Sequence, residues 1–207
     1  MTIKENIRGR INRVAETHFF IKPVLISALK RQIITPDGQR MVNGAKTYHE
    51  FWVNSLNENF YDMGTLIRLG TEIELGLKYF YMQRKGHLNL VALEQDPNYQ
   101  MNIFQRLMPW TNNNTIDLYK SQIHYELTSN TKLKDMQELM LYRHLYAHNA
   151  GLLNDKFIFD FHRLTQKNIS NFSSASTFPQ EDTYFFEPLK RLNQFIEDAR
   201  EFFFEFP

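Results

Sequence analysis

Apolar residues recur at intervals of three and four along most of this chain, a spacing that puts them on one face of an α-helix. The first such face reaches Pro23, and because proline is tolerated in the first turn of a helix, a second helix can begin there. The pattern predicts helices over residues 7–23, 24–33, 48–85, 103–107, 115–127 and 132–149. In the first of them, the residues expected to face the core are Ile7, Ile11, Val14, His18 and Ile21.

Three glycines interrupt the longest predicted helix, at Gly64, Gly70 and Gly76. Because glycine has no side chain, each position allows a neighbouring element to approach closely or the helix to bend. The three are spaced six apart within a helix and are not clustered after a strand, so they do not predict a phosphate-binding loop.

The C-terminal segment has the most regular pattern, with apolar residues that alternate four and three apart between charged ones. These residues are Phe185, Leu189, Leu192, Ile196, Ala199, Phe203 and Phe206. The spacing is typical of a seam between two helices. A bundle helix that packs on its own core is the first interpretation, and an interface between two copies of the chain is the second. The cluster Phe202–Phe206 favours the second, because it carries more aromatic surface than one helix face is expected to hide.

One segment departs from the helical pattern. Residues 157–161 have the sequence Phe-Ile-Phe-Asp-Phe, and this alternation predicts a short β-strand. The rest of the chain favours an all-α fold, since eight glycines and seven prolines are too few for a many-turned β architecture. With 207 residues, 43% of them hydrophobic, the chain is expected to form a single domain over residues 1–207.

Composition also limits the chemistry and the location. The absence of cysteine excludes disulfides and thiolate metal sites. No apolar run has the length of a membrane span, so a membrane is not an expected partner and the cytoplasm is the expected location.

The net charge of +1 is unevenly distributed along the chain. Residues 1–46 hold nine basic side chains against three acidic ones, whereas residues 168–207 hold three against seven. The basic segment is either a track for a nucleic-acid backbone or, as we favour, a solvated helix face. Its candidate residues are Arg8, Arg10, Arg13, Lys22, Lys30, Arg31 and Arg40.

Candidate chemistry gathers in one stretch, Arg143-His144-Leu-Tyr-Ala-His148-Asn149-Ala-Gly151. Gly151 tolerates positive φ, so it is expected to end the helix that begins near residue 132. Arginine can bind a phosphate through two parallel N–H donors, and an imidazole can take or give a proton near neutral pH. Arg143 and His148 lie about 140° apart around a helix, so they share a site only if the last turn distorts or a second chain completes it. His144 and His148, four residues apart, share a face.

The chain contains the same Arg-to-His spacing once more, from Arg13 to His18. That copy lacks the polar second position, the Asn after the His and the glycine exit, and it continues directly into Phe19 and Phe20. We interpret it as a coincidence.

The residues from Arg143 to Gly151 resemble the HEPN superfamily (higher eukaryotes and prokaryotes nucleotide-binding). Its members carry Arg, a polar residue, three variable residues and then His on a helix of an all-α bundle. His144 stands at the polar position, where Asn is common, and the stretch 149–154 is similar to the helix exit of bacterial defence-associated branches. The resemblance implies a bundle with long antiparallel helices. For many members it also implies a metal-independent endoribonuclease, active as a homodimer in which two Arg/His pairs face one cleft.

The resemblance also implies roles for individual residues. RNA is cleaved by attack of a 2′-hydroxyl on the adjacent phosphorus, with Arg143 on the phosphoryl oxygens and His148 as the proton carrier. His144 or Asn149 orients the substrate or His148. No cofactor and no metal are expected. The expected partners are RNA, single-stranded or tRNA-like, a second copy of the chain, and an antitoxin or sensor protein.

Several alternatives stay open. Some HEPN proteins have lost catalysis, so a non-catalytic module that binds nucleotide, RNA or protein is the main one. Without the family context, Arg143 is expected to pair with Glu138 or an acid of the final helix, and His148 to be favoured by the helix dipole. Glu72 and Glu74 are candidates to orient Arg143, although Glu74 and Lys78 also fit a plain surface pair. A metal site would use His144 and His148 with Asp160 or His162.

Overall fold

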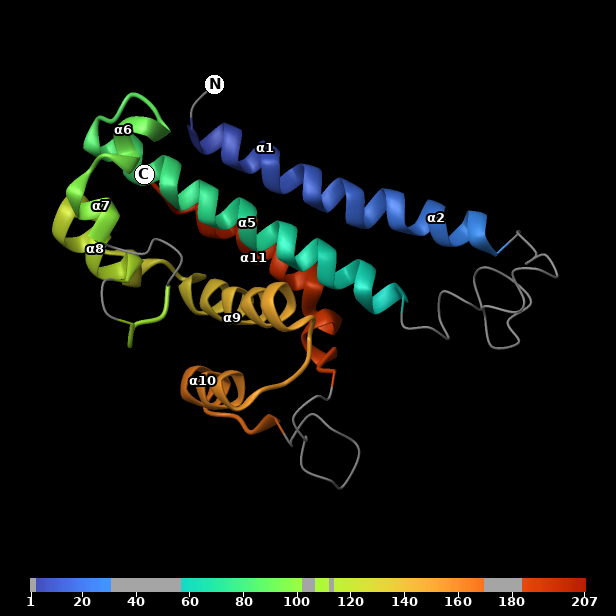
Figure 1. The fold of residues 1–207 in the computed structure, drawn as a ribbon. Helices are drawn as coiled ribbons and strands as arrows, with labels where there is room; N and C mark the ends of the chain where they lie inside the picture. The colour runs from blue at the N-terminus through green and yellow to red at the C-terminus, as the bar shows by residue number, and fades with distance from the viewer. Residues whose placement is uncertain (1–2, 31–56, 102–106, 112–113, 170–183) are drawn as a thin grey trace.

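The computed structural model of the protein describes residues 3–30, 57–101, 107–111, 114–169 and 184–207. Within these ranges the chain is all-α, as the sequence predicts, and it contains no β-strand (Figure 1). The α-helices are α1 Ile3–Glu16, α2 Lys22–Leu29, α5 Asn57–Lys85, α6 Leu90–Glu94, α7 Pro97–Met101, α8 Thr115–Ile123, α9 Leu133–Asn149, α10 Asp155–Thr165 and α11 Leu192–Phe204. Short turns of other helical types are η1 Thr17–Ile21, η2 Leu127–Ser129 and η4 Glu187–Arg191. The predicted helical residues 31–33, 48–56 and 103–106 lie outside the described ranges.

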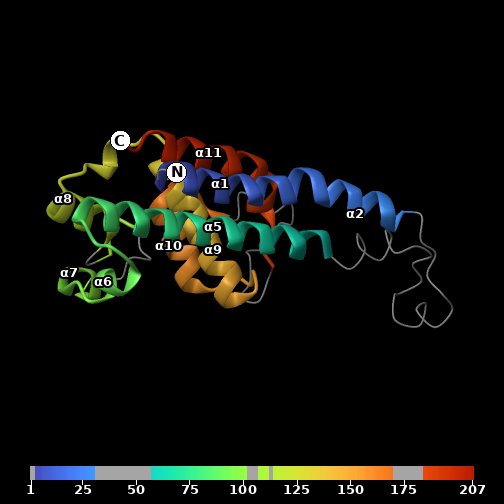
Figure 2. The ribbon, with the colours of Figure 1, turned by 90° about the horizontal axis from the view of Figure 1, so that it is seen from above.

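The long helices are stacked in layers (Figure 1). Helices α5 and α11 form the central layer, α1 packs on one side of both, and α9 packs on the other. Helix α10 covers the far side of α9. Seen from above, α2 extends beyond the end of the bundle, and accordingly none of its residues is buried (Figure 2). This arrangement makes α9 a central helix, with neighbours on three sides.

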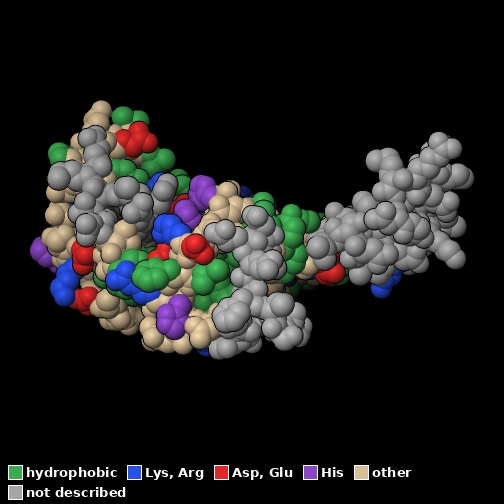
Figure 3. Space-filling model, turned by 60° about the horizontal axis from the view of Figure 1, so that its bottom comes forward, with side chains coloured by type: hydrophobic (Ala, Val, Ile, Leu, Met, Phe, Trp, Pro, Cys, Tyr) green, Lys and Arg blue, Asp and Glu red, His purple; other side chains and the backbone are tan. Residues whose placement is uncertain are grey.

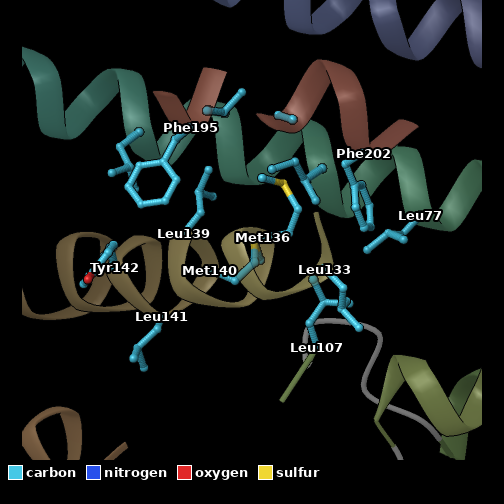
Figure 4. Packing of buried hydrophobic residues seen from close by; sticks show 14 of the residues in the cluster. Leu77, Leu107, Leu133, Met136, Leu139, Met140, Leu141, Tyr142, Phe195 and Phe202 are labelled. Atoms are coloured by element: carbon cyan, nitrogen blue, oxygen red, sulfur yellow. The ribbon is translucent and has the colours of Figure 1, made fainter. Parts of the chain in front are cut away.

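The core lies where α9 meets α5 and α11 (Figure 4). Met136 and Leu139 point from α9 towards Phe195 and Phe202 of α11, while Leu141 points the opposite way (Figure 4). Because α9 presents apolar residues to several neighbours, it is buried around most of its circumference. A helix that is apolar on nearly all sides is expected in the interior of a bundle.

A π-helical turn, η1, joins α1 to α2 and changes which residues face the core. The predicted apolar face holds as far as His18, since Ile7, Ile11, Val14 and His18 are all buried. Ile21 was predicted to continue this face, but it is 57% exposed. The π turn adds a residue to the helical repeat, and this rotates the following residues away from the core.

The strand predicted at residues 157–161 is wrong, because these residues lie inside α10. Phe157 and Phe161 are buried one turn apart, while Phe159 between them is 64% exposed. The side chain of Asn154 accepts a hydrogen bond from the backbone N–H of Phe157 at 2.8 Å and so caps the start of the helix. The alternation of phenylalanines therefore coincides with a helical spacing of four.

The C-terminal pattern is explained by burial within one chain. All seven residues of the predicted seam are buried, from Phe185 to Phe206. The argument for a dimer from the cluster Phe202–Phe206 is wrong, because Phe202, Phe203 and Phe206 are buried in the bundle. Only Phe204 of these phenylalanines is exposed, and Lys4 lies over its ring at 5.2 Å.

Among the described helices, none combines the length and the apolar character needed to cross a membrane.

Candidate functional site

The end of α9 fixes the position of the candidate motif. The helix runs from Leu133 to Asn149, and the chain leaves it through two left-handed residues, Ala150 with φ 51° and Gly151 with φ 86°. This confirms Gly151 as part of the helix exit. The exit is anchored to the segment before η4, since the backbone N–H of Phe185 donates to the carbonyl of Gly151 at 2.9 Å.

Arg143 lies between α9 and α5, at a point where the two helices are close. A Cβ atom at Gly70 of α5 would stand 2.7 Å from Cγ of Arg143 and 3.1 Å from its Cβ. Glycine at this position therefore lets the stem of Arg143 rest on the backbone of α5. Gly76 is a second close approach, beside Phe203, whereas Gly64 has nothing within 4 Å.

The guanidinium of Arg143 forms an ion pair with Glu74, one turn further along α5. Its Nη2 donates to Oε2 of Glu74 at 3.4 Å, and the exposed fractions of the two side chains are 19% and 9%. The pair is only partly made, because Nε of Arg143 and Oε1 of Glu74 are buried without a hydrogen-bond partner. Buried polar atoms in proteins usually have a hydrogen-bond partner, so the contact between Arg143 and Glu74 leaves part of both side chains unsatisfied.

Burial and nearby positive charges have opposite effects on the pKa of the Glu74 carboxyl. Burial raises its pKa above the ordinary value, and the positive charges of Arg143, Lys78 and His148 partly oppose this shift. Arg143 and His148 therefore act on the same buried carboxyl, although they project in different directions from α9. The last turn of α9 stays α-helical between them, so no distortion brings the two side chains together.

His148 and His144 are exposed on the surface of α9. Their ring centroids are 4.6 Å apart, as expected for two residues that share a helix face. Asn149 is the last residue of the helix, and its carbonyl accepts a hydrogen bond from the N–H of Leu152 at 2.8 Å. His144 and His148 are thus exposed together, whereas Arg143 packs against α5 on another side of α9.

The contacts distinguish between the earlier candidates for a partner of Arg143. Glu74 pairs with it, whereas Glu72 pairs with Arg10 and Glu138 pairs with Arg191. The identity of this partner was left open at the sequence level, because it depends on how α5 packs on α9. The signal for it was the combination of Gly70 with an acid four residues later on the same helix.

The second Arg-to-His spacing places its residues differently, and Nδ1 of His18 is also buried without a hydrogen-bond partner, 3.8 Å from Oδ1 of Asp62. Arg13 is exposed, and His18 is buried with its Nε2 2.9 Å from the side-chain oxygen of Asn193. The alternative metal site is not formed among the described residues, since no three His, Asp or Glu side chains there lie close enough to hold an ion.

The charges of the basic N-terminal segment are partly neutralised. Arg10 pairs with Glu72 and Lys22 with Asp62, while Arg31 and Arg40 lie outside the described residues. On the face shown in Figure 3, Lys and Arg side chains alternate with Asp and Glu, and histidines reach the surface. A continuous basic stripe is not visible among the described residues of that face.

Comparison of the chain with protein-family models, curated proteins and solved structures finds no match in any of the three.

Proposed function

We propose that this protein is a metal-independent endoribonuclease of the HEPN type. The observation that carries the proposal is the Arg143–Glu74 ion pair together with the exposed His148 five residues later, because it puts a phosphate ligand and a proton carrier in the last turns of one helix. The all-α fold and the helix exit at Gly151 agree with the family that the motif resembles.

The proposed reaction is the attack of an RNA 2′-hydroxyl on the adjacent phosphorus. It leaves a 2′,3′-cyclic phosphate and a 5′-hydroxyl. Arg143 binds the phosphoryl oxygens and stabilises the charge that develops on them. His148, which is exposed, exchanges the proton with the reacting oxygen, and His144 or Asn149 orients the substrate. Glu74 holds the guanidinium in place from beneath.

A homodimer fits this chemistry. The reaction removes a proton from the 2′-hydroxyl and delivers one to the leaving oxygen, so two groups act on opposite sides of the phosphorus. A second copy that faces the first across the His144–His148 surface would supply the second imidazole. Light scattering at micromolar concentration tests this part, and a strict monomer contradicts it.

The test of the catalytic proposal is cleavage of single-stranded RNA in EDTA by the purified protein. We expect Arg143→Ala and His148→Ala each to abolish cleavage. Arg13→Ala is the matched control, because it removes the same charge from the second Arg-to-His spacing, and we expect it to leave cleavage unchanged. Full cleavage by both site variants rules out the assigned residues.

The biological setting that we propose is a cytoplasmic defence or toxin system with an antitoxin or sensor partner. Expression of the wild-type protein is then expected to arrest growth, and His148→Ala is expected to relieve the arrest. Normal growth of cells that express the wild-type protein counts against this setting.

One observation favours a second candidate, a non-catalytic module that binds nucleotide, RNA or protein. Arg143 is mostly buried and already engaged by Glu74, so a phosphate can reach it only if this ion pair opens. The RNA cleavage assay distinguishes the two candidate functions. A non-catalytic module binds an RNA oligonucleotide and releases it intact, and Arg143→Ala leaves that binding nearly unchanged.

A further inference from the structure

A pocket of about 610 Å³ lies beside the first turn of α9. It is formed by the start of α9, the end of α10 and the segment 107–111, and Trp110, Lys134, Gln137 and Arg163 are among its lining residues. Its volume is within the range of sites for small organic ligands.

The lining has the chemistry of a site for an aromatic anion. The guanidinium of Arg163 lies over the ring of Trp110, 4.6 Å from its centroid. Lys134 supplies a second positive charge, and no carboxylate belongs to the lining. Within the described ranges, neither Lys134 nor Arg163 forms an ion pair with an acidic side chain. Both charges are therefore available to a ligand.

The side chain of Gln137 forms part of the pocket wall. Gln137 is 7% exposed, and its Nε2 donates to the carbonyl of Leu107 at 2.8 Å, which holds the segment 107–111 against α9. Helix α9 begins at Leu133 without a side-chain cap, so the positive end of its dipole also faces this region.

The pocket residue Gln137 and the two histidines lie on the same side of the α9 axis. Gln137, His144 and His148 are spaced seven and four residues apart, which aligns them along one helix face. With a rise of 1.5 Å per residue, the two histidines lie about 10 and 16 Å from Gln137 along the axis.

We propose that this pocket binds one nucleotide of a single-stranded RNA at a fixed distance from the bond that is cut. The base stacks on the Arg163–Trp110 pair, and the phosphate lies beside Lys134. The identity of the strand as RNA rests on the proposed function, whereas the preference for a nucleotide rests on the pocket itself. The pocket would thus select an unpaired base a short way along the strand from the scissile linkage.

The experiment uses the two tryptophans of the chain, Trp52 and Trp110. In a His148→Ala, Trp52→Phe protein, Trp110 is the only fluorescent tryptophan, and a 2′-O-methylated oligonucleotide is a ligand that cannot be cut. We expect the oligonucleotide to quench Trp110. We also expect Arg163→Ala and Trp110→Ala, each followed by fluorescence anisotropy of a labelled oligonucleotide, to weaken binding roughly 5- to 100-fold. Lys134→Ala should reduce the slope of log K against log salt by roughly 0.7, the value for one lost phosphate contact.

Two controls make the result specific. Trp110→Phe keeps an aromatic face and should retain most of the affinity, which separates stacking from a folding defect. Arg13→Ala removes the same charge from α1, on the other side of the bundle, and should leave the affinity unchanged. If Arg13→Ala weakens binding as much as Arg163→Ala, or if Trp110 is not quenched, the pocket proposal is overturned.

The source of the nucleotide is tested with free AMP. AMP should compete weakly, because it does not extend to the histidines, and competition as tight as that of the oligonucleotide overturns a strand as the occupant. The two proposals also fail separately. Cleavage that depends on His148, together with unchanged affinity in the pocket variants, removes the pocket alone. Pocket-dependent binding by a protein that never cuts RNA removes the ribonuclease alone.

Discussion

The contact between Gly70 and Arg143 gives a quantitative prediction for alanine at two glycines of α5. Gly64 has open space around its missing Cβ, so Gly64→Ala is expected to stabilise the protein by about 1 kcal/mol through helix propensity. Gly70→Ala has the same intrinsic gain, but its Cβ would stand 2.7 Å from Cγ of Arg143, close to the backbone where the side chain cannot easily move. Overpacking of this kind costs about 1–3 kcal/mol.

The difference between the two variants isolates the close approach, because the propensity and unfolded-state effects largely cancel. We expect Gly70→Ala to be less stable than Gly64→Ala by about 1–3 kcal/mol. Urea unfolding followed by circular dichroism at 222 nm measures both values. In an Arg143→Ala background, where Cγ is absent, the difference should shrink to below about 1 kcal/mol.

Equal stabilisation by the two alanines would refute this reasoning, since it would mean that α5 and α9 are not in contact at Gly70. An unchanged difference in the Arg143→Ala background would show that some neighbour other than the Arg143 stem resists the new methyl group. In both cases the placement of Arg143 against α5 would need revision.

Three further predictions follow from the same region. Because burial raises the pKa of Glu74 above its ordinary 4.5, the folded protein holds a proton that the unfolded chain releases, and the unfolding free energy should fall as pH rises above about 4.5. Urea unfolding from pH 4 to 7 measures this fall, which should be weaker in Glu74→Gln. In the exposed control Glu197→Gln the fall should be the same as in the wild type. At the exit of α9, Ala150→Gly should raise the unfolding free energy by about 1 kcal/mol, because Ala150 has φ 51° and glycine adopts this conformation without strain. Gly151→Ala should lower the unfolding free energy by at least about 1 kcal/mol for the same reason. A change of the same sign in both variants would contradict the left-handed exit. Asn154→Ala should cost about 1 kcal/mol in the same measurement by removing the cap of α10, and a change near zero would argue against that cap.

The fold class and the central helix were predictable because local signals agree there. Helix α9 was expected from residue 132 to 149 and runs from Leu133 to Asn149, since its apolar spacing and the glycine after it indicate the same end. Helix α8 ends at Ile123, earlier than predicted, because His124 adopts a left-handed conformation with φ 51°. That choice is not encoded in the apolar spacing, which continues to Leu127.

The errors arise where one pattern has two structural solutions. Phe157 and Phe161 fit both a strand face and successive helix turns, and the cap at Asn154 decides for the helix. The π turn at Thr17–Ile21 has no signal in the apolar spacing before it, so the rotation of Ile21 could not be foreseen. The partner of Arg143 could not be predicted from the sequence, because Arg143 and Glu74 are 69 positions apart and lie on different helices.

The burial of α9 on three sides has a consequence for the timing of motions at the motif. Its backbone amides should exchange with deuterium only when the whole bundle opens, whereas those of the unburied α2 should exchange quickly. Motions at residues 143–149 that are faster than this opening are then expected to be rotamer changes of Arg143 and its neighbours, with the α9 backbone intact.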